Sequence, residues 1–469
     1  MLPATVTTLA IVTQDQAALR AAARDSSAQN AVLWQGDVLE IRGRRGDYLQ
    51  VYDHRRERAG YVREVQLRRV SLAPGEAPEL LAVVRFLRDT PGAEALGIGY
   101  AAAYLRAAPA ESLTAEPLDA IGAMAERLAR GASADRAKGK DPALAAHLEV
   151  AAQYGIRVRS FDRNGRVQVC YDGEVYRRVL AMPTAEPDQQ ARAALGVTRH
   201  ECIDPGVGPS DRYQLDLWRA TVLDRVPATG LDPMLASRLH ARRAGVWSSV
   251  AFEQVRRGEP PQAAAQRAMQ ELTAVSAGDL GDDTQPEYTE AAVRVGTVRW
   301  AAEFTSRSSG RLAVTTAPGA PGETCVTLED TRHPIGNPLL KRCTYGTVWT
   351  ASARGNSGGT ALTLAVQPLD TWRELWVFRK GAQGWTVDVL PPGTSSPDVG
   401  YVEFAGFTPG AKRMLVAREV RVDGHFRRRF EVLRLDTLVA DRQASAPELL
   451  PDFERWQDST WKHQTVALR

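Results

Sequence analysis

The spacing of apolar residues changes twice along the chain, and these changes limit the folds open to it. Up to about residue 70, apolar and polar residues alternate, as in strands that bury one face. Between residues 74 and 277 the apolar residues follow the period of about 3.6 that places them on one side of a helix. Strand-like runs return beyond residue 289. The sequence therefore predicts a multidomain α and β protein with boundaries at 1–72 (β), 73–277 (helical), 278–288 (linker) and 289–469 (β).

The first 72 residues are predicted to form a small antiparallel barrel. Short β runs, at 38–41, 48–51 and 60–62, are separated by turns that contain glycine and aspartate. Period-two apolar residues between such turns are typical of a small closed sheet.

Four motifs in this segment occur in an order that resembles the bacterial SH3-like domain. They are Ala-Leu-Arg-Ala at 18–21, Gly-Asp at 36–37, Gly-Asp-Tyr-Leu-Gln-Val at 46–51 and Gly-Tyr-Val at 60–62. The tryptophan that usually follows Gly-Asp in this family is Tyr48 here. Members of the family often belong to periplasmic or wall-associated proteins and hold peptides or cell-wall material.

The resemblance implies a binding site near the turns of the barrel. Its expected residues are Tyr48, Tyr52 and Tyr61, with Arg55 and Arg56 supplying positive charge from the adjacent loop. An alternative is that the barrel docks on the helical domain and buries these tyrosines.

The middle of the chain, 73–277, is predicted to be mainly helical. Leu80, Val84 and Leu87 form an apolar stripe that follows Pro78, and similar stripes recur up to residue 277. One insertion, 156–171, has alternating residues on both sides of an Asn-Gly pair at 164–165, which predicts a β-hairpin.

Beyond the acidic, glycine-bearing linker at 278–288, three strand–turn–strand units form a weak repeat. Their first strands are expected at 298–304, 348–354 and 402–407. The spacing of about 50 residues, within the range of propeller blades, resembles the meanders of secreted propeller repeats. Because a closed ring needs about four to eight blades, we expect an incomplete, propeller-like antiparallel sheet that stays open or curved.

The four cysteines fall into two local pairs, Cys170 with Cys202 and Cys325 with Cys343. Four cysteines allow three pairings, and locality favours these two bridges. Disulfides persist in oxidising compartments, so the protein is expected to be periplasmic or secreted, with a signal peptide removed from the given chain. Four reduced, buried thiols are the alternative. Zinc is disfavoured because the sequence has no Cys-x-x-Cys or His-x-x-x-His spacing.

Charge and hydropathy exclude several classes of partner. The chain has 59 basic and 56 acidic residues, well mixed, so a nucleic acid partner is not expected. The basic cluster at 427–429 is expected to be a solvated sheet face. No run of about 18 apolar residues exists that would predict a transmembrane segment.

Two motifs suggest hydrolytic chemistry. Gly-Asn-Ser-Gly-Gly at 355–359 resembles the nucleophile loop of trypsin-like serine proteases, but no histidine stands in the family's upstream context, and His333 is only 24 residues before Ser357. We therefore interpret Ser357 as a hairpin-turn residue.

Cys202 directly follows His200-Glu201, and SH3-like modules often accompany cysteine peptidases or amidases. We expect His200 to be badly placed to serve Cys202, so His240 would have to be brought in by folding. A bridge to Cys170 would remove this nucleophile.

These observations predict a non-enzymatic exported protein that binds or scaffolds a protein, a peptide or a cell-wall component. No catalytic residue, metal or cofactor is assigned. A cell-wall-directed hydrolase, targeted by the SH3-like module, is the alternative.

Overall fold

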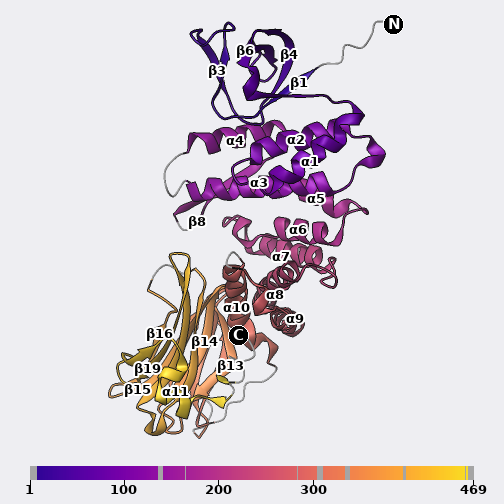
Figure 1. The fold of residues 1–469 in the computed structure, drawn as a ribbon. Coiled ribbons are helices and arrows are strands. Elements are labelled where there is room, and N and C mark those ends of the chain that lie inside the picture. Colours follow the sequence, from indigo (N-terminus) through magenta and orange to yellow (C-terminus); the bar gives the residue numbers. More distant parts are fainter. Residues whose placement is uncertain are drawn as a thin grey trace. The chain divides into compact units, whose positions relative to one another are not determined.

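Figure 1 shows the computed structural model, in which strands, helices and further strands follow one another along the chain. The chain forms two compact units, Met1–Gly208 and Pro209–Arg469. The order of elements confirms the predicted succession of a β-rich start, a helical middle and a β-rich end. The structure describes residues 8–135, 141–163, 165–281, 284–303, 310–332, 338–394, 398–459 and 461–462.

The first unit begins with a seven-stranded antiparallel sheet whose order is β3-β2-β6-β5-β4-β1-β7. Alternate side chains of its strands, including Leu19, Leu39 and Leu49, are fully buried in one shared core. Burial of each such side chain contributes about 1.5–3 kcal/mol. The strands are β1 (Leu9–Val12), β2 (Ala17–Arg20), β3 (Gln29–Leu33), β4 (Val38–Arg45), β5 (Tyr48–Asp53), β6 (Arg58–Arg63) and β7 (Leu67–Val70).

Helices and one hairpin complete the first unit. The predicted stripe of Leu80, Val84 and Leu87 is buried on the first helix. The hairpin pairs its two strands as expected; Asn164 lies outside the described residues, and Gly165 has the positive φ of 75° that its turn requires. The elements are α1 (Ala77–Arg88), α2 (Glu94–Ala107), α3 (Glu116–Asp135), α4 (Pro142–Gln153), β8 (Val158–Arg163), β9 (Arg166–Tyr171), α5 (Glu174–Ala181) and α6 (Pro187–Val197).

The turn between β3 and β4 packs directly on the helices of the same unit. Gly36 has a φ of 90°, and a Cβ at this position would lie 2.4 Å from the carbonyl oxygen of Ala95 in α2. The Tyr154 hydroxyl donates to the Gly36 carbonyl over 2.6 Å, and the Gln153 amide donates to Asp37 over 3.0 Å. Sheet and helices therefore meet in a close interface that only glycine permits at position 36.

The second unit starts with four helices, α7 (Pro209–Asp224), α8 (Pro233–Arg256), α9 (Gln262–Thr273) and α10 (Gln285–Val298). Asp232 caps α8, since its carboxylate accepts from the backbone N–H groups of Met234 and Leu235, and Pro233 occupies the first turn. The helices predicted over 73–277 are thus divided between the two compact units, with α7 to α9 in the second.

One predicted strand, 298–304, is wrong over residues 298–303, and Phe304 lies outside the described residues. Val298 ends α10, and Arg299–Ala302 is a 3-10 helix. Val298, Trp300 and Ala301 are buried against α8, α9 and the sheet, so packing on several sides makes this short apolar run helical. The segment predicted as a linker, 278–288, includes the first turn of α10.

The strands of the second unit form a three-stranded sheet, β10-β11-β12, and an eight-stranded sheet, β13-β14-β15-β17-β18-β19-β20, with β16 paired to β15. The expected strands at 348–354 and 402–407 lie within β13 and β17. The strands are β10 (Leu312–Pro318), β11 (Thr324–Asp330), β12 (Leu340–Thr344), β13 (Thr347–Gly355), β14 (Ala361–Leu369), β15 (Trp372–Gly381), β16 (Gly384–Leu390), β17 (Gly400–Phe407), β18 (Arg413–Val422), β19 (His425–Arg434) and β20 (Ala440–Ala444), and α11 (Pro451–Trp456) follows them.

Helices pack on one side of the larger sheet, where Val293 of α10 is buried with Tyr401 of β17, and residues of α8 and α9 are buried with Trp349 of β13. Trp349 packs with Trp300 and Val298 in this interface, and its indole N–H donates to Gln367 over 2.9 Å. Trp372 and Trp376 are also buried. These tryptophans serve the core rather than an exposed sugar-binding surface.

Candidate functional site

The pairing of β5 with β6 brings the three predicted tyrosines to one face of the N-terminal sheet. Tyr48 lies opposite Arg63, Tyr61 opposite Gln50, and Tyr52 opposite Ala59. Directly paired residues of antiparallel strands point to the same side. The intervening residues, among them Leu49, Val51 and Val62, fill the core, so the tyrosines lie on the outer side.

Tyr48 is anchored within this face. Its hydroxyl donates to the Asp25 carboxylate over 2.5 Å, and Arg63 donates to the same carboxylate over 3.0 Å. The hydrogen bonds from Arg63 and Tyr48 lower the pKa of Asp25 to about 2. The hydrogen bond to Asp25 raises the pKa of Tyr48. Because the ring is only 7% exposed, Tyr48 positions the face rather than offering much of its own surface.

The guanidinium group of Arg42 lies over the ring of Tyr52. The guanidinium carbon of Arg42 lies 3.9 Å from the ring centroid, and the His54 ring meets Tyr52 edge-on at 4.8 Å. Glu40 fixes both neighbours, at 3.3 Å from Arg42 and 2.6 Å from His54. The hydrogen bonds from His54 and Arg42 lower the pKa of Glu40. Tyr52 and Tyr61 are half-buried, so each keeps part of its ring in solvent.

We call the set Tyr48, Tyr52, Tyr61, Arg42 and Arg63 the tyrosine face. Arg42 and Arg63 were missed by sequence reasoning, although alternation along β4 and β6 places them as outward residues. An aromatic surface with fixed guanidinium groups can stack on flat or apolar groups and pair with carboxylates. Such a surface is suited to binding and does not provide a nucleophile with its base.

Arg55 and Arg56, the other two predicted binding residues, have acidic partners at the boundary between sheet and helices. Arg55 donates to Glu149 of α4 over 2.9 Å. Arg56 donates to Asp53 over 2.7 Å and to Asp37 over 3.3 Å. Since Asp37 also accepts from Gln153 of α4, this cluster supports the docking of the sheet.

The sheet does dock on the helices, as one alternative expects, but this docking does not bury Tyr52 and Tyr61. The sheet docks on the helices through its β3–β4 turn, and Asp15 adds a contact of 2.8 Å to His147 of α4. The polar and ring partners described for Tyr48 and Tyr52, which are Asp25, Arg42, His54 and Arg63, belong to the sheet segment itself. Docking thus leaves the tyrosine face on the sheet's own surface.

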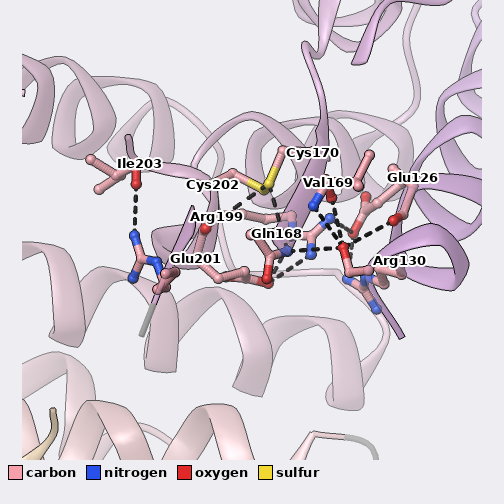
Figure 2. The surroundings of a disulfide bond; sticks show 12 residues. Glu126, Arg130, Gln168, Val169, Cys170, Arg199, Glu201, Cys202 and Ile203 are labelled. Carbon is pink, nitrogen blue, oxygen red and sulfur yellow. Dashed lines mark hydrogen bonds and ion pairs between the residues drawn. A yellow bond between two sulfur atoms is a disulfide. The ribbon is translucent and has the colours of Figure 1, made fainter. Parts of the chain in front are cut away.

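The structure contains the disulfide Cys170–Cys202, which ties the end of β9 to the 3-10 helix His200–Cys202. Figure 2 shows the surroundings of this disulfide. Arg199 pairs with Glu126 at 3.5 Å and with Glu201 at 2.8 Å. The thiolate that a cysteine peptidase would need at Cys202 is therefore absent from this arrangement.

The second disulfide, Cys325–Cys343, joins residues that lie directly opposite each other on β11 and β12. Within the ranges that the structure describes, one group of acidic and sulfur side chains has the spacing of a metal site, namely Glu323 with these two cysteines. Disulfide formation uses both sulfurs, so this group does not fit a metal ion.

Ser357 occupies the exposed turn between β13 and β14. The neighbouring Asn356 organises this turn, because its side-chain oxygen Oδ1 accepts from the backbone N–H groups of Thr360 and Ala361 at 2.9 and 3.1 Å. His333, the nearest histidine in sequence, lies outside the described residues. His240 of α8 is hydrogen bonded to Glu271 of α9 over 2.6 Å, where it joins two helices.

Comparison of the chain with protein-family models, curated proteins and solved structures finds no match. Among the helices that the structure describes, none combines the length and the apolar character needed to cross a bilayer.

Proposed function

We propose that this chain is a non-enzymatic protein of the periplasm or cell envelope that binds a protein, peptide or cell-wall component through its N-terminal SH3-like sheet. The observation that carries the proposal is the tyrosine face. Strand pairing gathers three aromatic rings and two arginines on one side of a small sheet, while the docking contacts come from its β3–β4 turn and from the loops that carry Asp15 and Arg55.

The two disulfides support the proposed compartment. Each compact unit contains one of them, so the inference of an oxidising compartment rests on two separate disulfides. Disulfides of this kind persist in the periplasm and outside the cell and are rare in the bacterial cytosol. The bridge at Cys202 also favours binding over the hydrolase alternative, whose candidate nucleophile it occupies.

Cosedimentation with purified peptidoglycan, together with a peptide array, tests the proposal. The double variant Tyr52→Ala/Tyr61→Ala removes the two partly exposed rings and leaves the Tyr48–Asp25 anchor in place. We expect at least about tenfold weaker binding, because aromatic side chains dominate binding energies at such surfaces.

The matched control is Phe86→Ala, which removes an aromatic ring that is 73% exposed on α1 of the same unit. This variant should bind as the parent protein does. Equal binding by Tyr52→Ala/Tyr61→Ala would contradict the assignment to the tyrosine face. Release of soluble fragments from peptidoglycan by the pure protein would overturn the non-enzymatic reading.

A further inference from the structure

Four hairpin turns at one end of the eight-stranded sheet surround an open groove of about 1470 Å³. Its wall includes residues of the β13–β14, β15–β16, β17–β18 and β19–β20 turns, and Trp456 at the end of α11 also lines it. This volume exceeds the roughly 300–1,000 Å³ of pockets that enclose small molecules. The groove therefore has room for several units of an extended ligand.

Two arginines of the groove face each other across neighbouring strands. Arg413 of β18 is paired directly with Arg434 of β19. Like charges in this position destabilise a sheet unless they are compensated. Asp441, at 2.8 Å from Arg413, and Asp436, at 2.8 Å from Arg434, supply that compensation. The result is a fixed array of alternating hydrogen-bond donors and acceptors.

Two lysines add charge that is not compensated. Lys380 and Lys412 line the groove from different hairpins, and both are exposed. Within the part of the chain that the structure describes, neither has an ion-pair partner. The groove thus offers two free ammonium groups beside the paired arginines, which favours a ligand with separated negative charges.

The remaining lining indicates the kind of ligand. Trp456 is 43% exposed, and hydroxyl groups come from Thr360, Thr386 and Thr408. A protein partner usually needs a cluster of buried aromatic anchors, and Trp456 is the one aromatic ring among the described residues that line the groove. One ring surrounded by polar groups suits the stacking of a sugar ring and hydrogen bonds to its hydroxyls.

Nucleic acid fits the groove less well. The phosphates of a DNA duplex follow one another at about 3.4 Å of helix axis on each strand, and they would meet the carboxylates of Asp436, Asp441 and Asp452. A chain of sugar acids carries at most one carboxylate on each ring, with neutral hydroxyls between them. Such a ligand can place its charges at the lysines and its hydroxyls at the aspartates.

We propose that this groove binds an anionic polysaccharide, with Lys380 and Lys412 pairing with its carboxylates and Trp456 stacking on a sugar ring. The site lies in the second unit and uses no residue of the tyrosine face, so it goes beyond the function proposed above. The two assignments can fail separately.

Calorimetric titration of the full chain with polygalacturonate tests the proposal. Fully methyl-esterified polygalacturonate is the matched neutral ligand, and poly-L-glutamate is the matched acidic peptide. We expect polygalacturonate to bind and the ester to bind at least about tenfold more weakly, as the loss of charge-assisted hydrogen bonds predicts.

The variant Lys380→Gln/Lys412→Gln should lose at least about tenfold in affinity for polygalacturonate, because it removes both free charges. The control Arg427→Gln/Arg429→Gln removes two exposed cations near the other end of β19 and should bind normally. Tyr52→Ala/Tyr61→Ala should also bind normally, which separates this site from the tyrosine face.

Several results would overturn the proposal. They are the absence of binding to polygalacturonate, equal binding of its methyl ester, and unchanged affinity in Lys380→Gln/Lys412→Gln. Equally tight binding of poly-L-glutamate that Trp456→Ala does not weaken would assign the groove to acidic peptides instead.

Discussion

Glu403 and Glu419 lie on the same face of the larger sheet, yet the pKa values of their carboxyl groups shift in opposite directions. Burial raises the pKa of Glu403, but the charges of Arg299 and Arg373 outweigh burial and lower it. These guanidinium groups lie 3.3 and 2.7 Å from the Glu403 carboxylate. Burial raises the pKa of Glu419 to about 7, and the charge of Arg428, which is 3.7 Å away and partly exposed, offsets only part of this rise.

This difference predicts how Glu419→Gln changes stability with pH. The pKa of Glu419 in the folded chain, about 7, is above its ordinary value of 4.5, so its contribution to stability is complete below pH 4.5 and is lost as the pH rises through 7. The loss is on the order of 3 kcal/mol, at about 1.4 kcal/mol for each pKa unit. Glutamine keeps an acceptor for the Tyr401 hydroxyl, which donates to Glu419 over 3.1 Å.

We therefore expect Glu419→Gln to be more stable than the parent protein at pH 8 and similar at pH 4.5. Urea unfolding followed by tryptophan fluorescence measures this, since nine of the ten tryptophans belong to the second unit and only Trp34 belongs to the first. Glu403→Gln is the matched control and should be less stable at pH 8, because it leaves Arg373 without its buried partner. Parallel pH profiles of Glu419→Gln and the parent would contradict the argument.

A second prediction at the residue scale concerns Ser357. The backbone of its turn is held by Asn356, and the serine side chain is exposed. Ser357→Ala should leave binding and stability within about 0.5 kcal/mol of the parent protein, as for other exposed substitutions. Fluorophosphonate labelling of Ser357 would show instead that the hydroxyl is an activated nucleophile.

At the scale of elements, the β3–β4 turn determines how the N-terminal sheet and the helices of its unit meet. Gly36 combines a left-handed backbone with a close approach to α2, so it has two separate reasons to be glycine. Gly46, in the β4–β5 turn, has a φ of 59° but open space around its Cα. Comparing alanine substitutions at Gly36 and Gly46 therefore distinguishes the cost of backbone strain from the cost of disturbing the interface.

Gly36→Ala should destabilise the first unit by roughly 2–5 kcal/mol, the sum of left-handed strain and overpacking. Gly46→Ala should cost only about 1–2 kcal/mol, from the backbone alone. Hydrogen exchange of the α2 amides, Glu94–Ala107, measures the difference directly. Similar loss of protection in the two variants would mean that the turn does not form the interface described here.

At the scale of the whole molecule, each compact unit is held by one disulfide, and both bridges belong to the proposed oxidising compartment. Protein purified from a periplasmic fraction without reductant and then denatured should show almost no free thiol by colorimetric titration. After reduction it should show all four cysteines. Two or more reactive thiols per chain before reduction would contradict the export of this protein.

The sequence by itself determined the local features of this protein. Alternating residues between glycine turns specify the strands of the first sheet, because a strand that buries one face has period two. Prolines and caps such as Asp232 place helix starts, since these residues act on the backbone beside them. The disulfide pairs followed from locality, because bridging distant cysteines requires a fold that the sequence does not display.

Only the tertiary structure decided which of these elements meet. The run at 298–304 reads as a strand, but burial against α8, α9 and the sheet makes its first residues helical. Register alone brings Tyr61 beside Tyr48 and Tyr52, and docking alone directs Arg55 to Glu149. Lys380 and Lys412 are distant in sequence, and the well-mixed charges of the chain do not single them out. Folding of the hairpins places both in the lining of one groove. Burial likewise sets the opposite pKa shifts of two glutamates, because desolvation and nearby charge depend on neighbours that are distant in sequence.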